Sequence, residues 1–131
     1  MPPRDRYHGA ARRALERDGW VITHDPLIIP FGSRELYADL GADAPLAAER
    51  EGRQIAVEIK GFLGPSPVVE LERALGQFLL YEFLMEAAHP GRVLYLGVPN
   101  FAFDVHLKES PARDFLAAHG IRLVVFDAEA R

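Results

Sequence analysis

Hydrophobic positions near the start of the chain repeat at helical spacing. They predict a helix over residues 5–18, ended by Gly19, and the apolar residues on its buried face are Tyr7, Ala11, Ala14 and Leu15. The run at 20–23 is rich in aromatic and β-branched residues, which favours a strand, and we expect this strand at an edge of the sheet. Pro30 and Gly32 then indicate a loop.

The next segment alternates between apolar and other residues, a pattern typical of a strand. It covers residues 36–42, with Leu36, Ala38, Leu40 and Ala42 on one face. A turn at 51–52 leads to residues 54–60, which are rich in β-branched residues and contain neither Pro nor Gly. We therefore expect a hairpin whose second strand lies at the centre of the sheet.

A long helix is predicted after a break rich in Gly and Pro at residues 61–67. Ser66 is a good N-cap and Pro67 a good first helical residue, so the helix should run from there to about Ala88. One sheet face can cover only about a third of a helix circumference. The apolar residues of this helix extend over more of its circumference than the sheet can cover. We therefore expect some of them to contact a partner in a homodimer or hetero-oligomer. They are Phe78, Leu79, Leu80, Tyr81, Phe83, Leu84 and Met85.

The last third of the chain predicts a strand at 92–99, a helix at 110–120 and a strand at 121–127. The complete order is α-β-β-β-α-β-α-β. An antiparallel hairpin beside a β-α-β crossover makes a mixed sheet flanked by helices. With 131 residues, 49% of them hydrophobic, the chain is expected to form a single domain over 1–131, of the α/β class with an α+β mixed sheet.

Composition narrows the range of functions. The chain contains no cysteine, which excludes disulfide frameworks, cysteine-ligated metals and cysteine nucleophiles. The N-terminal residues resemble neither a signal peptide nor a membrane span, so we expect a cytoplasmic protein with no membrane partner. The net charge is −4, whereas phosphate binding needs clustered Lys and Arg. A nucleic-acid role would therefore benefit from a partner with a basic surface.

Two charged side chains lie at the end of the central predicted strand. Residues two apart on a strand point to the same face, so Glu58 and Lys60 should project together. Phosphodiester hydrolysis needs a hard cation held by carboxylate oxygens and a positive group near the phosphate. Glu58 is suited to hold Mg²⁺ or Mn²⁺, and Lys60 to supply the positive charge. Asp39, on the preceding strand, is the second carboxylate expected. A bare Glu-x-Lys is also common as an ordinary surface pair.

The choice of the second carboxylate depends on the hairpin register. A two-residue turn at 51–52 would bring Asp43, rather than Asp39, opposite Lys60. A β-bulge would shorten the strand and restore Asp39 to the site. We prefer Asp39 and keep Asp43 as the rival. Two histidines could assist metal or phosphate binding but are assigned no role: His8 and His24.

Six stretches, in order and over nearly the whole chain, resemble the XisH family of fdxN-element excision controlling factors, in the PD-(D/E)XK nuclease superfamily. They are Asp18-Gly19-Trp20, Thr23-His24-Asp25-Pro26, Tyr37-Ala38-Asp39-Leu40-Gly41-Ala42, Ala47-Ala48-Glu49, Ile55-Ala56-Val57-Glu58-Ile59-Lys60 and Ala74-Leu75-Gly76-Gln77-Phe78. Proteins of this family are cyanobacterial factors associated with programmed excision of a DNA element during heterocyst development, alongside a recombinase and a small companion, XisI. The resemblance implies a restriction-endonuclease-like core, a role in DNA rearrangement and an XisI-like partner.

The superfamily pattern also implies site residues. Its Asp, Glu-x-Lys and helical Gln correspond to catalytic Asp39, Glu58, Lys60 and Gln77, and Gly61 stands where this family more usually has Ser. Two functions remain open. One is a DNA endonuclease that depends on Mg²⁺ or Mn²⁺. The other is a non-catalytic regulatory subunit that acts through an XisI-like protein. A role as an accessory factor in DNA rearrangement is common to both.

Overall fold

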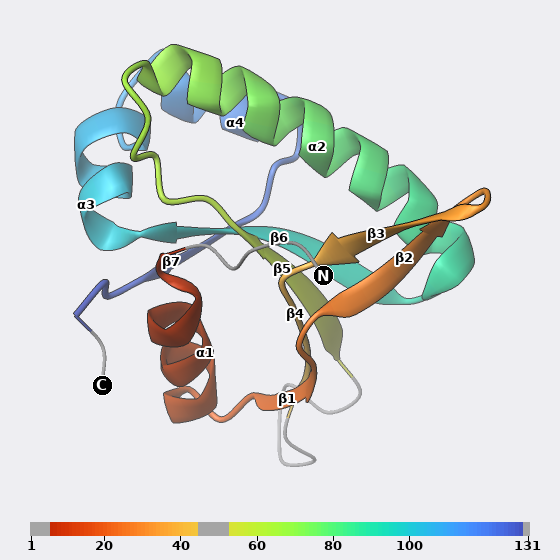
Figure 1. Cartoon of the computed structure of the whole chain (residues 1–131). Helices are drawn as coiled ribbons and strands as arrows, with labels where there is room; N and C mark the ends of the chain where they lie inside the picture. Colours follow the sequence, from red (N-terminus) through yellow and green to blue (C-terminus); the bar gives the residue numbers. More distant parts are fainter. Residues whose placement is uncertain (1–5, 45–52, 130–131) are drawn as a thin grey trace.

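A five-stranded mixed sheet forms the centre of the computed structural model, which describes residues 6–44 and 53–129 (Figure 1). The strand order is β1-β4-β5-β6-β7. The first three strands in this order pair antiparallel, and β5, β6 and β7 pair parallel. Their bounds are β1 Val21–His24, β4 Leu40–Asp43, β5 Gln54–Ile59, β6 Arg92–Pro99 and β7 Leu123–Phe126. The mixed sheet, the edge position of β1 and the central position of β5 are as the sequence predicts.

Helices cover both faces of this sheet (Figure 1). The helical segments are α1 His8–Arg17, α2 Pro67–Ala88, α3 Asn100–Ala102, the π-helix η2 Phe103–Leu107, and α4 Ala112–Ala118. In β5, Ile55, Val57 and Ile59 pack with α1, whereas Ala56 packs in the core under α2. Glu58, which alternates with Val57 and Ile59, therefore points towards α2.

The limits of α2 match the prediction. The helix begins at Pro67, and the Ser66 side chain accepts a hydrogen bond from the backbone N–H of Val69 at 3.3 Å. Residues 100–107, between β6 and α4, were not expected to be helical but form α3 and η2. None of the helices in residues 6–44 and 53–129 is both long and apolar enough to cross a membrane.

The expected strand over 36–42 is wrong as a single element. It divides at Asp39 into β4 and a separate strand, β3 (Arg34–Ala38), which pairs only with β2 (Leu27–Phe31). The loop expected around Pro30 and Gly32 is therefore a hairpin. Gly32 begins its two-residue turn with a φ of 59°, a left-handed conformation that favours glycine. Pro30 is tolerated in β2 because a strand at an open sheet edge does not need every backbone N–H for pairing.

Candidate functional site

The pairing of β4 with β5 brings Asp39 beside Glu58. Leu40 pairs with Val57 in this antiparallel ladder. Asp39 comes directly before Leu40 and Glu58 directly after Val57, so these two residues face each other at the end of the ladder. At the other end of β4, Asp43 pairs with Gln54, four residues from Glu58. The pairing is continuous from residue 40 to 43, so the bulge expected there is absent from the described strand. The turn expected at 51–52 lies outside the described residues.

Each of the two carboxylates accepts a hydrogen bond from the backbone of the segment opposite it. Asp39 Oδ2 accepts a hydrogen bond from the N–H of Ile59 at 2.7 Å, and Glu58 Oε1 accepts one from the N–H of Asp39 at 3.2 Å. This reciprocal arrangement fixes both side chains at the point where the chain leaves β3 and enters β4.

Burial makes the Glu58 carboxylate unusual. Glu58 is only 7% exposed, and its pKa is raised from 4.5 to about 8. The largest cause is loss of solvation, and the second is the negative charge of Asp39; the Lys60 ammonium partly offsets both by lowering the pKa. In the protein without a cation, Glu58 is therefore largely protonated at neutral pH. Carboxyl groups with such strongly raised pKa values are concentrated at functional sites.

Lys60 and Gln77 complete the group expected from the sequence. Lys60 Nζ lies 3.6 Å from Glu58 Oε2, and Gln77 Nε2 donates a hydrogen bond to the same oxygen at 2.7 Å. The backbone N–H of Lys60 bonds to the carbonyl of Gly97 at 2.8 Å, which continues the pairing of β5 with β6 past the end of the strand. All four predicted site residues thus lie together, with Gln77 contributed by α2.

Sequence reasoning missed Tyr81. It was counted among the apolar residues of α2, but its hydroxyl belongs to the electrostatic surroundings of the site, where Gln77 and the backbone of Tyr37 act to lower its pKa. Burial raises the pKa of this hydroxyl, and the nearby carboxylates act in the same direction. Its position four residues after Gln77, on the same face of a helix, was the pattern that could have identified it.

The family model described as XisH protein matches residues 1–131, the whole chain. The chain belongs to the XisH family. Among curated proteins, none matches it.

Two solved structures are similar to this XisH chain. One is an XisH family protein from Nostoc punctiforme PCC 73102, with 37% identity, a TM-score of 0.82, and coverage of 95% of this chain and 93% of that one. The other is an fdxN element excision controlling factor protein from Anabaena variabilis, with 36% identity, a TM-score of 0.82, and coverage of 96% and 93%. The similarity in both cases extends over nearly the whole of each chain.

The donor set of this XisH protein suits a weakly held Mg²⁺ or Mn²⁺. Residues 6–44 and 53–129 contain no group of three or more His, Cys, Asp or Glu side chains that could enclose a metal. However, Mg²⁺ in proteins is usually bound by only one or two carboxylates together with waters and substrate phosphates. Asp39 and Glu58 supply two hard oxygen donors, and the effect of the Asp39 charge on the pKa of Glu58 marks a place where a positive charge would be favourable.

Gly61 stands where the family more usually has Ser, and the Tyr7 ring lies close against it. A Cβ at this position would lie 3.1 Å from the ring of Tyr7, which is closer than most such contacts allow. A serine here would therefore require the Tyr7 ring to move.

The two histidines without an assigned role have structural partners. His8 Nε2 lies 2.7 Å from Asp25 Oδ1, and Arg12 donates to the other oxygen of Asp25 at 2.5 Å, so the group ties α1 to the segment after β1. The His24 ring packs against Gly41, where a Cβ would meet Nδ1 at 3.0 Å. Burial lowers the pKa of His24.

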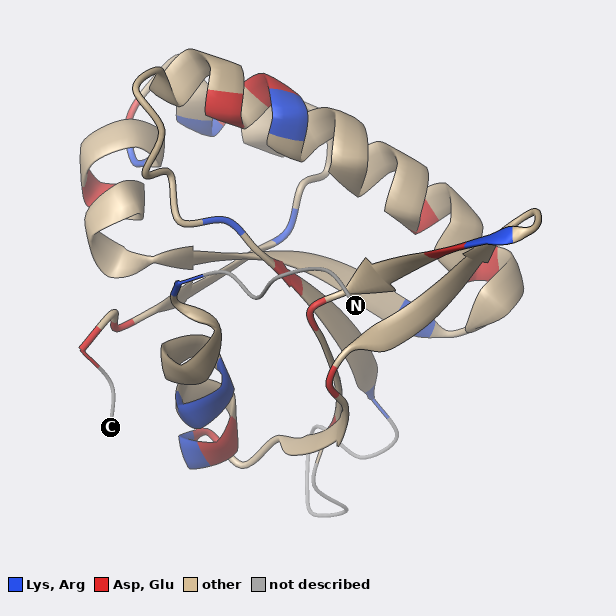
Figure 2. Cartoon of the chain, in the orientation of Figure 1, with Lys and Arg blue, Asp and Glu red and all other residues tan. Residues whose placement is uncertain are grey.

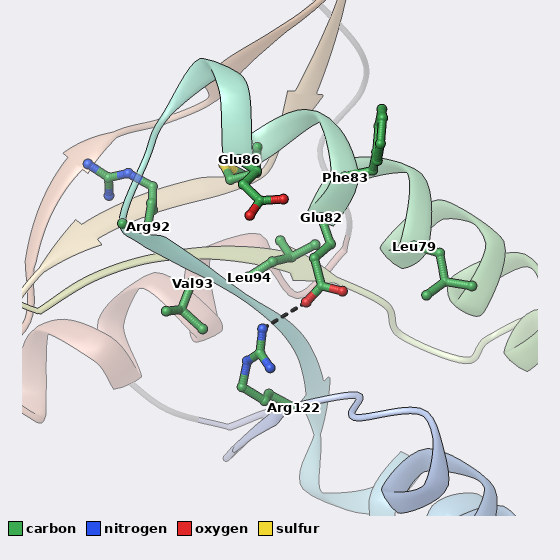
Figure 3. Close-up of a pocket in the computed structure, with 10 residues that line it drawn as sticks. Leu79, Glu82, Phe83, Glu86, Arg92, Val93, Leu94 and Arg122 are labelled. Atoms are coloured by element: carbon green, nitrogen blue, oxygen red, sulfur yellow. Dashed lines mark hydrogen bonds and ion pairs between the residues drawn. The ribbon is translucent and has the colours of Figure 1, made fainter.

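A hollow lies away from the carboxylates (Figure 3). It has a volume of about 510 Å³ and is bordered by the C-terminal half of α2 and the start of β6. It contains none of the four predicted site residues. Glu82 and Arg122 form an ion pair of 2.8 Å across it, and the Phe83 side chain stands at its rim, 75% exposed. Its chemistry is that of a contact surface, with no convergent catalytic groups.

Proposed function

We propose that this XisH protein is a divalent-metal-dependent DNA endonuclease of the PD-(D/E)XK superfamily, with a restriction-endonuclease-like core, and that it acts as an accessory factor in DNA rearrangement. The observation that carries the proposal is the reciprocal Asp39–Glu58 pair, with Lys60 and Gln77 on the same carboxylate. The description of the Anabaena relative as an fdxN element excision controlling factor supports the DNA-rearrangement role.

Each side chain has a distinct task in this proposal. Asp39 and Glu58 would hold Mg²⁺ or Mn²⁺, which supplies Lewis-acid stabilisation of the phosphate and activation of water when bound. Gln77 and Lys60 both engage Glu58 Oε2, so they fix the carboxylate and leave Oε1 with one longer hydrogen bond. The Lys60 ammonium is also available to stabilise negative charge that develops on phosphate oxygens.

The surface charge of the chain is only partly suited to DNA binding. Lys and Arg are spread over separate elements, with a cluster on α1, and acidic segments lie among them (Figure 2). Because phosphate contacts dominate non-specific affinity, a chain of net charge −4 is expected to bind DNA weakly by itself. A basic partner, such as an XisI-like protein, would supply what this surface lacks.

Mn²⁺ titration calorimetry tests the metal site. Wild-type protein at pH 8 is expected to bind Mn²⁺ with a dissociation constant of order 0.1–1 mM, since two carboxylates give a weak site without substrate. Glu58→Gln should bind at least about tenfold more weakly, because it removes one of two charged ligands. Glu86→Gln, an exposed glutamate on α2, is the matched control and should bind like wild type. Equal heats for wild type and Glu58→Gln would remove Glu58 from the site.

A second candidate function is a non-catalytic subunit that works through protein contacts. The observation that favours it is the exposed apolar surface of α2, where Leu79, Leu80 and Phe83 are 46%, 42% and 75% exposed. The sheet and the hairpin thus leave a large part of Leu79 and Leu80 uncovered. Exposed aromatic and aliphatic groups gathered on one helix often mark an interface.

The shape of this helix face favours a second copy of the same chain. A Cβ at Gly76 would meet nothing within 4 Å, so a shallow gap lies two turns before the protruding Phe83 on the same face. In an antiparallel pair of α2 helices, each phenyl ring would fit over the glycine of the other. Such a contact is self-complementary, as a two-fold dimer requires.

Light scattering tests this association. Wild-type protein is expected to gain mass with concentration, and Phe83→Glu should remain monomeric because a charge would be placed in the contact. Val105→Glu is the control, since Val105 is 72% exposed but lies on η2. A wild type that stays monomeric at all concentrations would reject the homodimer. A monomer that binds an XisI-like protein through Phe83 would assign the face to that partner instead.

A further inference from the structure

A smaller hollow lies next to the carboxylates, between the loop that follows β5 and the first half of α2. It has a volume of about 270 Å³. Lys60 belongs both to this hollow and to the carboxylate site, where its Nζ lies 3.6 Å from Glu58 Oε2, so the two adjoin. The residues that line the hollow are Lys60, Gly61, Phe62, Leu63, Glu70 and Arg73.

Two positive side chains from different elements meet at this hollow. Lys60 follows the end of β5, and Arg73 lies on α2 four residues before Gln77, on the same side of the helix. Arg73 is exposed and has no ion pair or hydrogen bond with the part of the chain that the structure describes. Its guanidinium therefore keeps its N–H donors for an anion from outside.

The loop side of the hollow is held in place at two points. Glu70 is the acidic residue of the hollow, and its Oε1 accepts a hydrogen bond from the N–H of Gly64 at 2.7 Å, so this carboxylate is engaged by the loop. Phe62 is 5% exposed and stacks on His106, with a φ of 56°. This left-handed conformation is strained for a phenylalanine, and such strain is concentrated at functional sites. The hollow is therefore preformed.

We propose that this hollow binds the DNA backbone phosphate adjacent to the scissile phosphate, and that Arg73 is its main ligand, with Lys60 beside it. The proposal rests on the proposed function, since it names a further contact to the same substrate. Phosphates repeat regularly along a strand, so a strand with one phosphate at the carboxylates continues past Lys60 with the next. Arginine suits this task because its planar fork matches two phosphate oxygens. Such a contact fixes the register of the strand without reading its sequence.

Fluorescence anisotropy of a labelled DNA duplex, with a chelator present to prevent cleavage, tests the phosphate site in the full chain. Arg73→Gln is expected to weaken binding about tenfold at about 50 mM salt and to reduce the slope of log affinity against log salt by about 1. Arg34→Gln makes the same change of charge at the exposed turn of the β2–β3 hairpin, which contacts His89 at the far end of α2. This control should lose less than about twofold.

A gain of affinity provides an independent test. Leu63 lines the hollow and is 54% exposed, so Leu63→Lys should add a phosphate contact, strengthen binding several-fold and increase the salt slope by about 1. Val105→Lys adds the same charge on η2, where Val105 is 72% exposed, and should change affinity much less. Equal gains in these two variants would show that only net charge matters and would overturn the site.

Mn²⁺ titration separates the phosphate site from the metal site. Arg73→Gln should bind Mn²⁺ no more weakly than wild type, because Arg73 bonds to neither carboxylate. Equal DNA affinity in wild type and Arg73→Gln, or equal losses in Arg73→Gln and Arg34→Gln, would overturn the phosphate site and leave the metal site standing. A selective loss of DNA affinity in Arg73→Gln, in a protein whose wild type binds no Mn²⁺, would refute the nuclease and support the phosphate site alone.

Discussion

Replacing Lys60 with methionine is expected to reduce metal-dependent DNA cleavage by about 100- to 1,000-fold. Methionine keeps the length of the side chain but removes the ammonium, which lies 3.6 Å from Glu58 Oε2 and is the positive group nearest to the carboxylates among the described contacts. Loss of one preorganised charge that stabilises a transition state typically has an effect of this size. The measurement is the single-turnover rate on a plasmid or oligonucleotide substrate in Mn²⁺.

The matched control for this variant is Lys108→Met. Lys108 is exposed at the end of η2 and is the only other lysine of the chain, so it tests whether general charge loss explains the result. Mn²⁺ titration should show that Lys60→Met still binds the ion. Wild-type and Lys60→Met proteins that cleave at the same rate would show that any activity arises elsewhere or from a contaminant.

Glu58→Gln is expected to make the cation-free protein more stable at alkaline pH. The pKa of Glu58 is raised by burial to about 8 from an ordinary value of 4.5, so between these values the folded protein holds a proton that the unfolded chain has released. Folding stability must therefore fall as the pH rises through this interval, by a few kcal/mol in total. Glutamine cannot ionise, and the variant should not show this loss.

Urea denaturation at pH 5, 7 and 8.5, in the presence of a chelator, measures the effect. Wild type and Glu58→Gln should differ little at pH 5, and the variant should be clearly the more stable at pH 8.5. Adding Mg²⁺ at pH 8.5 should stabilise the wild type only, since a ligand that binds the folded state adds to its stability. Parallel pH profiles for the two proteins would show that Glu58 keeps an ordinary pKa and that the carboxylate pair is not under electrostatic strain.

Much of the scaffold could be predicted from local patterns. Ser66 and Pro67 specify the start of α2 by capping chemistry that depends on neighbouring residues alone. The unbroken run of β5 and its alternation placed Glu58 and Lys60 on one face, and the structure has them there. The approach of Gln77 followed from the family resemblance and is realised by its hydrogen bond to Glu58.

The errors arise where local patterns are silent about tertiary pairing. Alternation continues without a break across Asp39, so nothing in the sequence marks the point where the chain leaves one sheet for the other. Gly32 was taken as part of a loop because a glycine is equally typical of loops and of two-residue hairpin turns. Tyr81 was grouped with the apolar residues around it, since its hydroxyl comes near Glu58 and Asp39 only when α2 packs on the sheet.

The most direct test of the metal site is anomalous diffraction from crystals soaked in Mn²⁺ at pH 8.5. One anomalous peak is expected between Asp39 and Glu58, at about 2.1 Å from an oxygen of each carboxylate, with Gln77 still hydrogen-bonded to Glu58 Oε2. Crystals saturated with Mn²⁺ in which Asp39 still bonds to the N–H of Ile59, Glu58 still bonds to the N–H of Asp39, and no ion lies between the two carboxylates would contradict the proposed metal site.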